Sequence, residues 1–254
     1  GWSRGIRLAE LVEEIAAFTL REVDFRAEGR TAERLRADAP PGIVIPRIAW
    51  RLSGPRVLAM GFVDATPLAA IIADADAGRP DAFERVAPGV DPREIVERLA
   101  RACLRQLFVT GLFQGDPHPA NILIGRDGSV AFVDFGIFGE LTAADRALLA
   151  RYVRHLASGR LEEAFEAYAE MVDPGPGTDR RAYRRETLAV MADWLRSAGD
   201  LDLPPERRLT AHFQGEMFAL MRRHGVRMRP DLVLFWRALA VLDSTAHRLP
   251  VPFD

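Results

Sequence analysis

The sequence has 254 residues, of which 48% are hydrophobic and 28% charged, and its formal net charge is -2. This profile is typical of a folded globular protein and excludes collagen, bulk disorder and a disulfide scaffold. The single cysteine, Cys103, has no internal disulfide partner, and the near-zero net charge gives no indication of a nucleic-acid partner. All 34 basic residues are arginines, so no lysine of this sequence can take part in its chemistry.

The first part of the chain predicts one long helix followed by two strands. Apolar residues at helical spacing run from Ile6 to Ala37 and end at a Pro-Pro-Gly cluster. Two short apolar runs follow at 43–50 and 57–63, and the Ser-Gly-Pro turn between them predicts a β hairpin. Helices are then expected over 67–77 and, starting at an Asp-Pro pair, over about 91–110.

The stretch from Gly111 to Gly139 is rich in glycine, proline and short apolar runs, and beyond it the pattern returns to helices. The longest apolar run, Leu232–Leu242, carries Arg237 in its middle and is too short to span a membrane. The element order therefore predicts a small α/β part followed by a larger helical part. The expected helices of this second part cover 142–157, 160–172, 179–198, 205–224 and 230–248.

A second hairpin is predicted between Ile122–Ile124 and Val130–Val133, with Asp-Gly at its tip. Pairing the two strands symmetrically about this tip sets residue 122 opposite 133 and Asn121 opposite Asp134. Paired residues of an antiparallel ladder lie about 4.5–5.5 Å apart at Cα, so an amide and a carboxylate are aimed at one point. These hard oxygen ligands suit Mg²⁺ together with phosphate oxygens.

A third oxygen group, Asp116, precedes Asn121 by five positions. Pro117 and Pro119 fix the backbone on either side of His118 and stiffen this loop. A loop carboxylate beside a metal-bound phosphate can act as a base or orient an acceptor. The spacing from this aspartate to Asn121, and then by thirteen residues to an Asp-Phe-Gly triplet, is the catalytic-loop and metal-binding arrangement of protein kinases.

These motifs carry a resemblance to a known family. Residues 115–121 read Gly-Asp-Pro-His-Pro-Ala-Asn and resemble the Gly-Asp-Pro-His-Pro-Gly-Asn signature of the UbiB/AarF/ADCK (ABC1-type) atypical kinases. Residues 22–28 resemble their Glu-x-Asp-Phe/Tyr-x-x-Glu motif on the helix equivalent to kinase αC, and residues 132–139 resemble their metal-binding segment. The resemblance covers about residues 7–155 and continues more loosely to the end.

The resemblance implies an α+β, protein-kinase-like fold. Residues 1–63 would form a partial N-lobe, an αC-like helix plus a β hairpin, and residues 64–254 a largely helical C-lobe. It implies ATP and Mg²⁺ as cofactors and a role in ubiquinone or isoprenoid-lipid metabolism. The expected partners are a nucleotide, an isoprenoid lipid or quinone precursor and a membrane surface, with no nucleic acid. The expected location is cytoplasmic, peripheral at the inner membrane.

The resemblance also assigns roles by position. Asp134 and Asn121 would bind the metal, and Asp116 would be the catalytic base. Glu22 would match the αC glutamate that pairs with the ATP-binding lysine. The remaining cofactor-binding candidates are Asp24, Glu28 and His118.

The family's lysine and its nucleotide loop lie upstream of this helix, and this sequence contains neither. We therefore expect an N-terminally truncated member, and two functions stay open. One is an Mg²⁺-dependent ATPase or small-molecule phosphotransferase, and the other is a non-catalytic, kinase-like scaffold that binds a lipid or a protein. A third alternative, an aminoglycoside- or choline-type phosphotransferase, fits the Pro-His-Pro loop and the Glu-x-Asp helix poorly.

Overall fold

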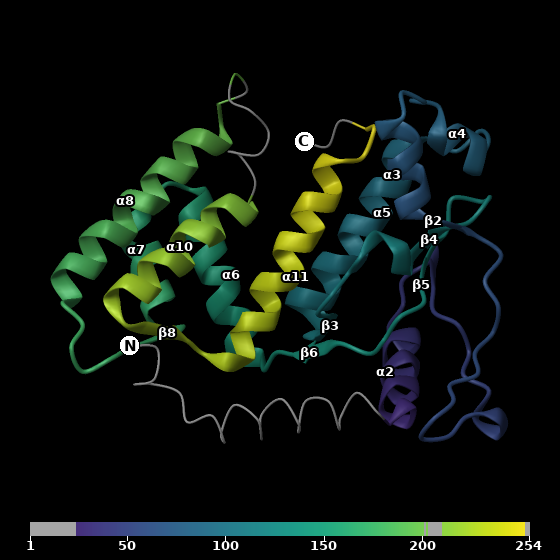
Figure 1. Cartoon of the computed structure of the whole chain (residues 1–254), viewed down its shortest axis with the longest axis horizontal. Helices are drawn as coiled ribbons and strands as arrows, with labels where there is room; N and C mark the ends of the chain where they lie inside the picture. The colour runs from purple at the N-terminus through teal and green to yellow at the C-terminus, as the bar shows by residue number, and fades with distance from the viewer. Residues whose placement is uncertain (1–23, 201, 203–209, 252–254) are drawn as a thin grey trace, which may run out of the picture.

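The computed structural model describes residues 24–200, 202 and 210–251. Its elements form two parts that Figure 1 shows side by side. Helices α6 (Ala143–Ala157), α7 (Leu161–Ala169), α8 (Arg180–Ala198) and α10 (Thr210–His224) gather in one part. A small sheet with the earlier helices forms the other part, and α11 (Pro230–His247) runs between them. The fold is therefore α+β with a largely helical second half, which confirms the predicted fold class.

Helix α2 (Phe25–Ala37) begins directly after Asp24. The backbone of Asp24 is extended, with φ -103° and ψ 92°, and its side chain accepts a hydrogen bond from the backbone N–H of Arg26 at 3.0 Å. An aspartate with this geometry is an N-cap, which satisfies a donor that the first helical turn leaves free. The prediction of one uninterrupted helix from Ile6 to Ala37 is therefore wrong at Asp24.

The main sheet has four strands in the order β1-β5-β4-β2. Strand β1 (Ile43–Val44) lies parallel to β5 (Val130–Phe132), which pairs antiparallel with β4 (Ile122–Ile124). At the far edge, β2 (Thr66–Pro67) pairs antiparallel with β4. The sheet thus joins a strand from the beginning of the chain to the hairpin that carries the candidate metal residues.

The predicted hairpin of 43–50 with 57–63 is only partly formed. Its two arms meet at isolated antiparallel bridges, Ile48 with Met60 and Gly54 with Val57, and a 3₁₀ turn, η1 (Trp50–Leu52), takes the place of the first arm's end. Pro46 lies inside the first arm and has no backbone N–H to donate to a ladder. The apolar pattern is therefore real, but a continuous two-stranded ladder was a wrong prediction.

The β4–β5 hairpin forms as predicted, but its register differs by one residue. Ile122 lies opposite Phe132 instead of residue 133. The loop is a three-residue one, closed by a hydrogen bond from the Gly125 N–H to the Ser129 carbonyl at 2.9 Å, with Gly128 at φ 74°. A left-handed glycine at the end of a three-residue loop is a common hairpin solution, and it moves the centre of symmetry from the bond between Asp127 and Gly128 to Asp127 itself.

The other expected helices are present. Helix α5 continues into the π-helical turn η2 (Arg105–Thr110), which ends at Gly111 with φ 79°. Residues 205–209 of one expected helix lie outside the described residues. The earlier expected helices are α3 (Leu68–Asp76) and α5 (Pro92–Leu104). The short helix α4 (Ala82–Val86) was not predicted. Nor were two short strand pairs, β3 (Leu112–Gln114) with β6 (Phe138–Glu140) and β7 (Val172–Pro174) with β8 (Val226–Met228).

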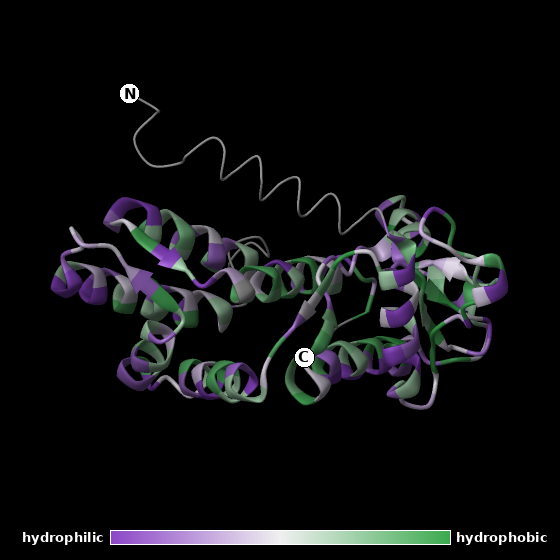
Figure 2. Ribbon diagram, turned by 90° about the horizontal axis from the view of Figure 1, so that it is seen from below, coloured by the Kyte–Doolittle hydropathy of each residue, from purple (hydrophilic) through white to green (hydrophobic). Residues whose placement is uncertain are grey.

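Two hydrophobic clusters hold these parts together. The larger one packs Tyr152, Tyr168 and Phe235 between the C-terminal helices, and the other packs Phe132 among the sheet and the early helices. Leu242 of α11 lies against both clusters. In the ribbon coloured by hydropathy, hydrophobic segments run through the middle of the molecule and hydrophilic ones occupy the outer turns (Figure 2). No helix in the described ranges combines the length and the apolar character that crossing a membrane requires.

The β3–β6 pair depends on a glycine. A Cβ on Gly139 would lie 2.0 Å from the ring of Phe113, which is buried. We expect Gly139→Ala to lower the free energy of unfolding by about 1–3 kcal/mol, because it forces the ring or the strand to move. Urea unfolding checks this. The matched control is Gly215→Ala on the open face of α10, where a Cβ meets nothing within 4 Å. Because alanine favours a helix more than glycine does, this control should raise the free energy of unfolding by about 0.5–1 kcal/mol.

Candidate functional site

The open end of the β4–β5 hairpin carries the two candidate metal residues. The side-chain amide of Asn121 donates to Asp134 Oδ2 at 2.8 Å, although its backbone carbonyl pairs with the N–H of Val133 at 3.1 Å. The other carboxylate oxygen, Asp134 Oδ1, accepts from the Gly136 N–H at 3.0 Å. The two side chains therefore meet as the hairpin prediction requires, despite the shifted register. Their role as metal ligands stays a prediction.

A buried glutamine hydrogen-bonds to the backbone of the segment that carries Asp134. Gln114 of β3 is 6% exposed, and its amide nitrogen donates to the backbone carbonyl of Asp134. Its own backbone N–H donates to the side-chain oxygen of Gln106 at 3.3 Å. A carbonyl that is fixed in this way orients the aspartate side chain toward the hairpin's open end. Sequence analysis did not identify Gln114.

Helix α2 supplies a second carboxylate. Glu28 Oε1 accepts a hydrogen bond from the backbone N–H of Phe135 at 3.2 Å. Burial raises the pKa of Glu28 above its ordinary value of 4.5, the N–H of Phe135 opposes that rise, and the nearby charge of Asp134 adds to it. The predicted cofactor-binding residue Glu28 therefore lies beside the predicted metal residue Asp134.

Asp24 and Glu22 are the other two acidic residues of the predicted helix motif. Asp24 uses its side chain to cap α2, and the described contacts do not bring it to the Asn121–Asp134 pair. Glu22 lies outside the described residues. Of the three carboxylates on this predicted helix motif, Glu28 alone is brought to the site in the part of the chain that the structure describes.

The loop before the hairpin is locked by its own backbone. The N–H of His118 donates to the Asp116 carbonyl at 2.7 Å, and the N–H of Asn121 donates to the His118 carbonyl at 2.8 Å. His118 Nδ1 accepts from the Ala120 N–H at 3.2 Å and so caps the 3₁₀ turn η3 (Pro119–Asn121). No non-glycine residue in the described ranges has a positive φ, so the alanine at position 120 fits this loop without strain.

An arginine far away in the sequence contacts the candidate catalytic base. Arg237 Nη2 of α11 donates to Asp116 Oδ2 at 2.7 Å, across 121 positions of sequence. The approach is close, since a Cβ on Gly115 would lie 2.5 Å from Leu234 Cδ1 of the same helix. Sequence analysis noted Arg237 only as a charge inside an apolar run. A lone charge at such a position is the signal that could have indicated its role.

A surface ion pair connects α2 to the segment that follows the Asp-Phe-Gly triplet. The guanidinium of Arg34 contacts both carboxylate oxygens of Glu140, at 2.8 and 3.3 Å, and both side chains are exposed. Exposed pairs contribute little to stability. Their two-pronged geometry nevertheless fixes how α2, and with it Glu28, lies relative to β6.

The donor set fits a magnesium ion that is shared with phosphate. Mg²⁺ is held by one or two carboxylates together with water and substrate phosphates, and Asp134 with the amide oxygen of Asn121 can supply two such oxygens. In the residues that the structure describes, no group of three or more His, Cys, Asp or Glu side chains forms a metal site by itself. A cation at this hairpin therefore needs phosphate or water oxygens to complete its coordination.

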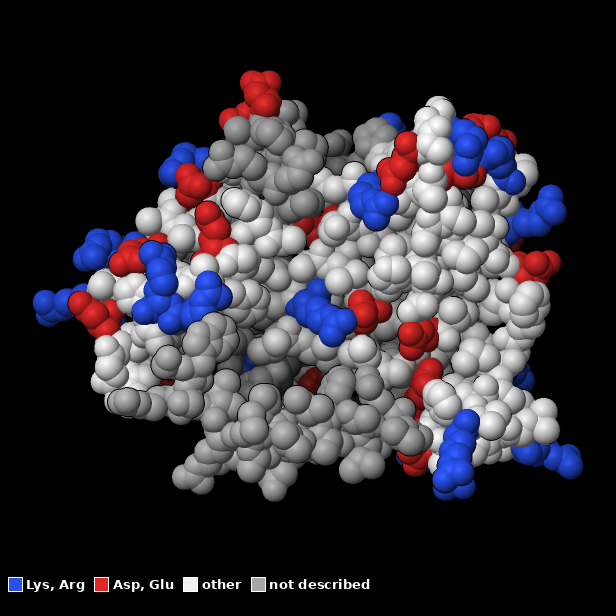
Figure 3. All heavy atoms as spheres, in the orientation of Figure 1, with Lys and Arg blue, Asp and Glu red and all other residues white. Residues whose placement is uncertain are grey.

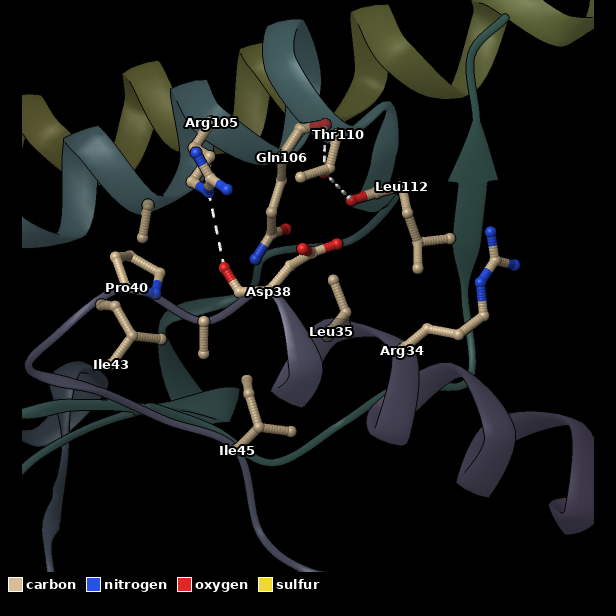
Figure 4. A pocket seen from close by; sticks show the side chains of 12 residues that line it. Arg34, Leu35, Asp38, Pro40, Ile43, Ile45, Arg105, Gln106, Thr110 and Leu112 are labelled. Atoms are coloured by element: carbon tan, nitrogen blue, oxygen red, sulfur yellow. Dashed lines mark hydrogen bonds between the residues drawn. The ribbon is translucent and has the colours of Figure 1, made fainter.

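A small cavity lies between the C-terminal end of α2, β1 and the end of α5, and none of the candidate site residues lines it (Figure 4). The Arg105 Nε donates to the backbone carbonyl of Asp38 at 3.4 Å on one side of it. On another side, the hydroxyl of Thr110 lies 3.3 Å from the carbonyl of Gln106 and 3.4 Å from that of Leu112. The cavity has room for about one water molecule. It is far too small for a nucleotide, so we assign no ligand to it.

The α+β architecture, with an acidic residue and an asparagine at the open end of a hairpin below an αC-like helix, defines a kinase-like protein. The sequence profile of the ABC1 atypical kinase-like domain matches residues 2–168. The chain therefore belongs to the ABC1 atypical kinase-like family.

Relatives support the same family. The chain is 33% identical to Protein ACTIVITY OF BC1 COMPLEX KINASE 1, chloroplastic, of Arabidopsis thaliana over 191 residues, which are 74% of this chain and 26% of that protein. The chain is also 24% identical to Protein ACTIVITY OF BC1 COMPLEX KINASE 7, chloroplastic, of Arabidopsis thaliana over 246 residues, which are 96% of this chain and 33% of that protein. The chain thus spans a third or less of the length of these two relatives.

Solved structures share the fold. One of them is the complex of Rv3197 with erythromycin from Mycobacterium tuberculosis, with a TM-score of 0.62 and 18% sequence identity. The similarity covers 98% of this chain and 60% of that one. The whole described architecture therefore occurs in a known protein.

The raised pKa of Glu28 gives a testable pH dependence. A carboxyl whose pKa is raised by folding keeps its proton longer in the folded chain, so stability falls as pH rises from about 4.5 through the raised folded value. Glu28→Gln keeps an acceptor for Phe135 but cannot ionise. We expect the wild type to lose stability relative to this variant over that pH window and then to level off, as measured by urea unfolding between pH 4 and 8.

The control for this experiment is Glu97→Gln, which removes one negative charge from the exposed face of α5, where Glu97 pairs with Arg101. A stability difference between wild type and Glu28→Gln that stays constant with pH would contradict the assignment.

Proposed function

We propose that this chain is the metal- and phosphate-handling part of an Mg²⁺-dependent, ATP-binding atypical kinase or ATPase. The observation that carries the proposal is the 2.8 Å contact between Asn121 and Asp134, with Asp116 in the loop that leads to it. Phosphoryl-transfer sites need oxygen ligands for a metal-bound nucleotide and a carboxylate for the attacking group. Membership in a kinase-like family supports this interpretation.

The proposed reaction is a transfer of the terminal phosphoryl group of ATP. The bond between the terminal phosphorus and its bridging oxygen breaks, and ADP leaves with that oxygen. A new bond forms to the oxygen of water or of a small hydroxyl-bearing acceptor, and Asp116 accepts the proton that this oxygen loses. Asn121 and Asp134 hold and orient the metal-bound nucleotide. Bound Mg²⁺ supplies positive charge that neutralises the phosphates.

The finer part of the proposal is a role in ubiquinone or related isoprenoid-lipid metabolism, with an isoprenoid lipid or quinone precursor as partner. It rests on the motif resemblance at residues 22–28, 115–121 and 132–139. Its test is the turnover of ATP with and without a short isoprenoid alcohol. A rise in turnover supports the lipid partner, and an unchanged rate contradicts it.

A cytoplasmic protein with peripheral contact to the inner membrane belongs to the same proposal, but the charges favour a weak contact. Arg184 pairs with Glu162, and Arg223 lies 3.7 Å from Glu186, so part of the basic charge on α8 and α10 is neutralised within the chain. Figure 3 shows basic and acidic residues interspersed on one face of the molecule. We therefore expect salt-sensitive sedimentation with anionic vesicles and none with neutral ones.

A second candidate function is a non-catalytic, kinase-like scaffold. In its favour, this stretch of sequence supplies no lysine, whereas kinases place a lysine on the nucleotide phosphates, so this stretch alone does not complete a nucleotide site of that kind. The two candidates differ in one measurable property, which is Mg²⁺-dependent binding of ATP.

Substitutions at the two aspartates separate binding from chemistry. We expect Asp134→Asn to abolish Mg²⁺-dependent ATP binding in a titration, because it removes the charged metal ligand. We expect Asp116→Asn to bind ATP with Mg²⁺ at least as tightly as the wild type but to lower the rate of phosphate release by about 10²–10³, by analogy with the loss of one charge-stabilising group.

The matched control is Asp127→Asn, at the other end of the same hairpin, where the carboxylate accepts the N–H of Ser129 at 3.0 Å. This variant should bind ATP like the wild type. Unchanged binding in Asp134→Asn would remove the metal assignment, and a wild-type chain that binds no ATP with Mg²⁺ would favour the scaffold.

A further inference from the structure

Helix α11 holds Arg237 at the catalytic loop by tight packing around it. Its neighbours Phe235, Trp236 and Ala238 are 0%, 5% and 0% exposed, so they fix the rotation of the helix about its axis. Arg237 itself is half exposed, and its guanidinium lies 2.7 Å from Asp116. The helix therefore presents one cation to the loop while the residues around it form the core.

The ion pair between Arg237 and Asp116 contributes little to the stability of the fold. Asp116 is 33% exposed and Arg237 50%, and pairs at such exposed positions contribute at most about 1 kcal/mol. A guanidinium has five N–H donors in a planar fork, and the contact to Asp116 that the structure records uses one nitrogen, Nη2. The remaining donors are suited to an anion with several oxygens.

The candidate site carries several negative charges, and a bound nucleotide would add more. Glu28, Asp116 and Asp134 bring three carboxylates, and a nucleotide adds its phosphates. Within the described residues, Arg237 is the cation that contacts one of these carboxylates, whereas Arg34 nearby is engaged with Glu140. Since this stretch of sequence has no lysine, a positive side chain that it contributes to the phosphates has to be an arginine, and a guanidinium binds phosphate well.

We propose that Arg237 is a phosphate-binding residue that is held on Asp116 until a nucleoside triphosphate arrives. With ATP at the Asn121–Asp134 pair, the guanidinium exchanges its contact with Asp116 for the oxygens of the terminal phosphate. Asp116 is thereby freed to accept a proton from the attacking group. Only hydrogen bonds are exchanged, and the guanidinium keeps all its protons. The inference rests on the proposed function and adds to it a selectivity for triphosphate over diphosphate.

The test compares two nucleotides in one variant. Arg237→Gln is titrated, with Mg²⁺, against a non-hydrolysable ATP analogue and against ADP. We expect the affinity for the ATP analogue to fall at least about tenfold, the effect of losing a hydrogen bond to a charged group. The affinity for ADP should be unchanged, because ADP lacks the terminal phosphate. Arg237→Lys should recover part of the discrimination.

Two further variants keep the test independent of folding. Arg248→Gln breaks a similarly exposed pair with Asp76, at 2.8 Å, at the end of the same helix, and should bind both nucleotides like the wild type. Asp116→Asn weakens the hold on Arg237, so its affinity for the ATP analogue should rise above that of the wild type.

The outcomes separate this inference from the function on which it rests. In one outcome the wild type binds nucleotide, and Arg237→Gln lowers the affinity for the ATP analogue and for ADP equally or leaves both unchanged. The phosphate assignment of Arg237 is then overturned, while the proposed function stands. If Asp116→Asn binds the ATP analogue more weakly than the wild type, Arg237 is held for structural reasons and the assignment is also overturned. A wild type that binds no nucleotide removes both proposals.

Discussion

The carboxylate of Asp134 connects the segments from which the candidate site is made. One oxygen accepts from Asn121 across the hairpin, and the other accepts from Gly136 within its own turn. The carbonyl of the same residue accepts from the buried Gln114, and the next N–H along the chain donates to Glu28 of α2. Moving this one residue would disturb a hairpin, a strand and a helix together, and the geometry of the site depends on it staying in place.

Local patterns predicted the parts of the fold that local interactions determine. The helices follow from apolar periodicity and capping residues, and the β4–β5 hairpin follows from its apolar arms and its turn. Besides the continuous ladder of 43–50 with 57–63, two local predictions failed for reasons that a pattern does not contain. The register of the β4–β5 hairpin shifted by one residue because Gly128 adopts a left-handed backbone, and α2 begins at Phe25 because Asp24 caps it. Both errors left the meeting of Asn121 and Asp134 intact.

Contacts between distant segments were beyond the sequence patterns. Glu28 reaches Phe135 over 107 positions and Arg237 reaches Asp116 over 121, and no periodicity encodes such pairs. The family resemblance supplied the motif that contains Glu28, because related chains share that helix. It supplied nothing for Arg237, although a charge in the middle of an apolar helix was visible. A buried helix retains such a charge only where a partner or a solvent opening exists, so a charge in an apolar run points to a contact of this kind.

The packing of α11 also limits where residues can be inserted into this chain or deleted from it. Each residue added to an α-helix turns everything beyond it by about 100° and advances it by 1.5 Å. A single insertion between Pro230 and Arg237 would therefore swing the guanidinium away from Asp116 and carry Leu242 out of the two clusters that it joins. Insertions and deletions in homologous sequences should consequently avoid this helix and collect in loops such as the one at 175–179, where neither cluster is disturbed.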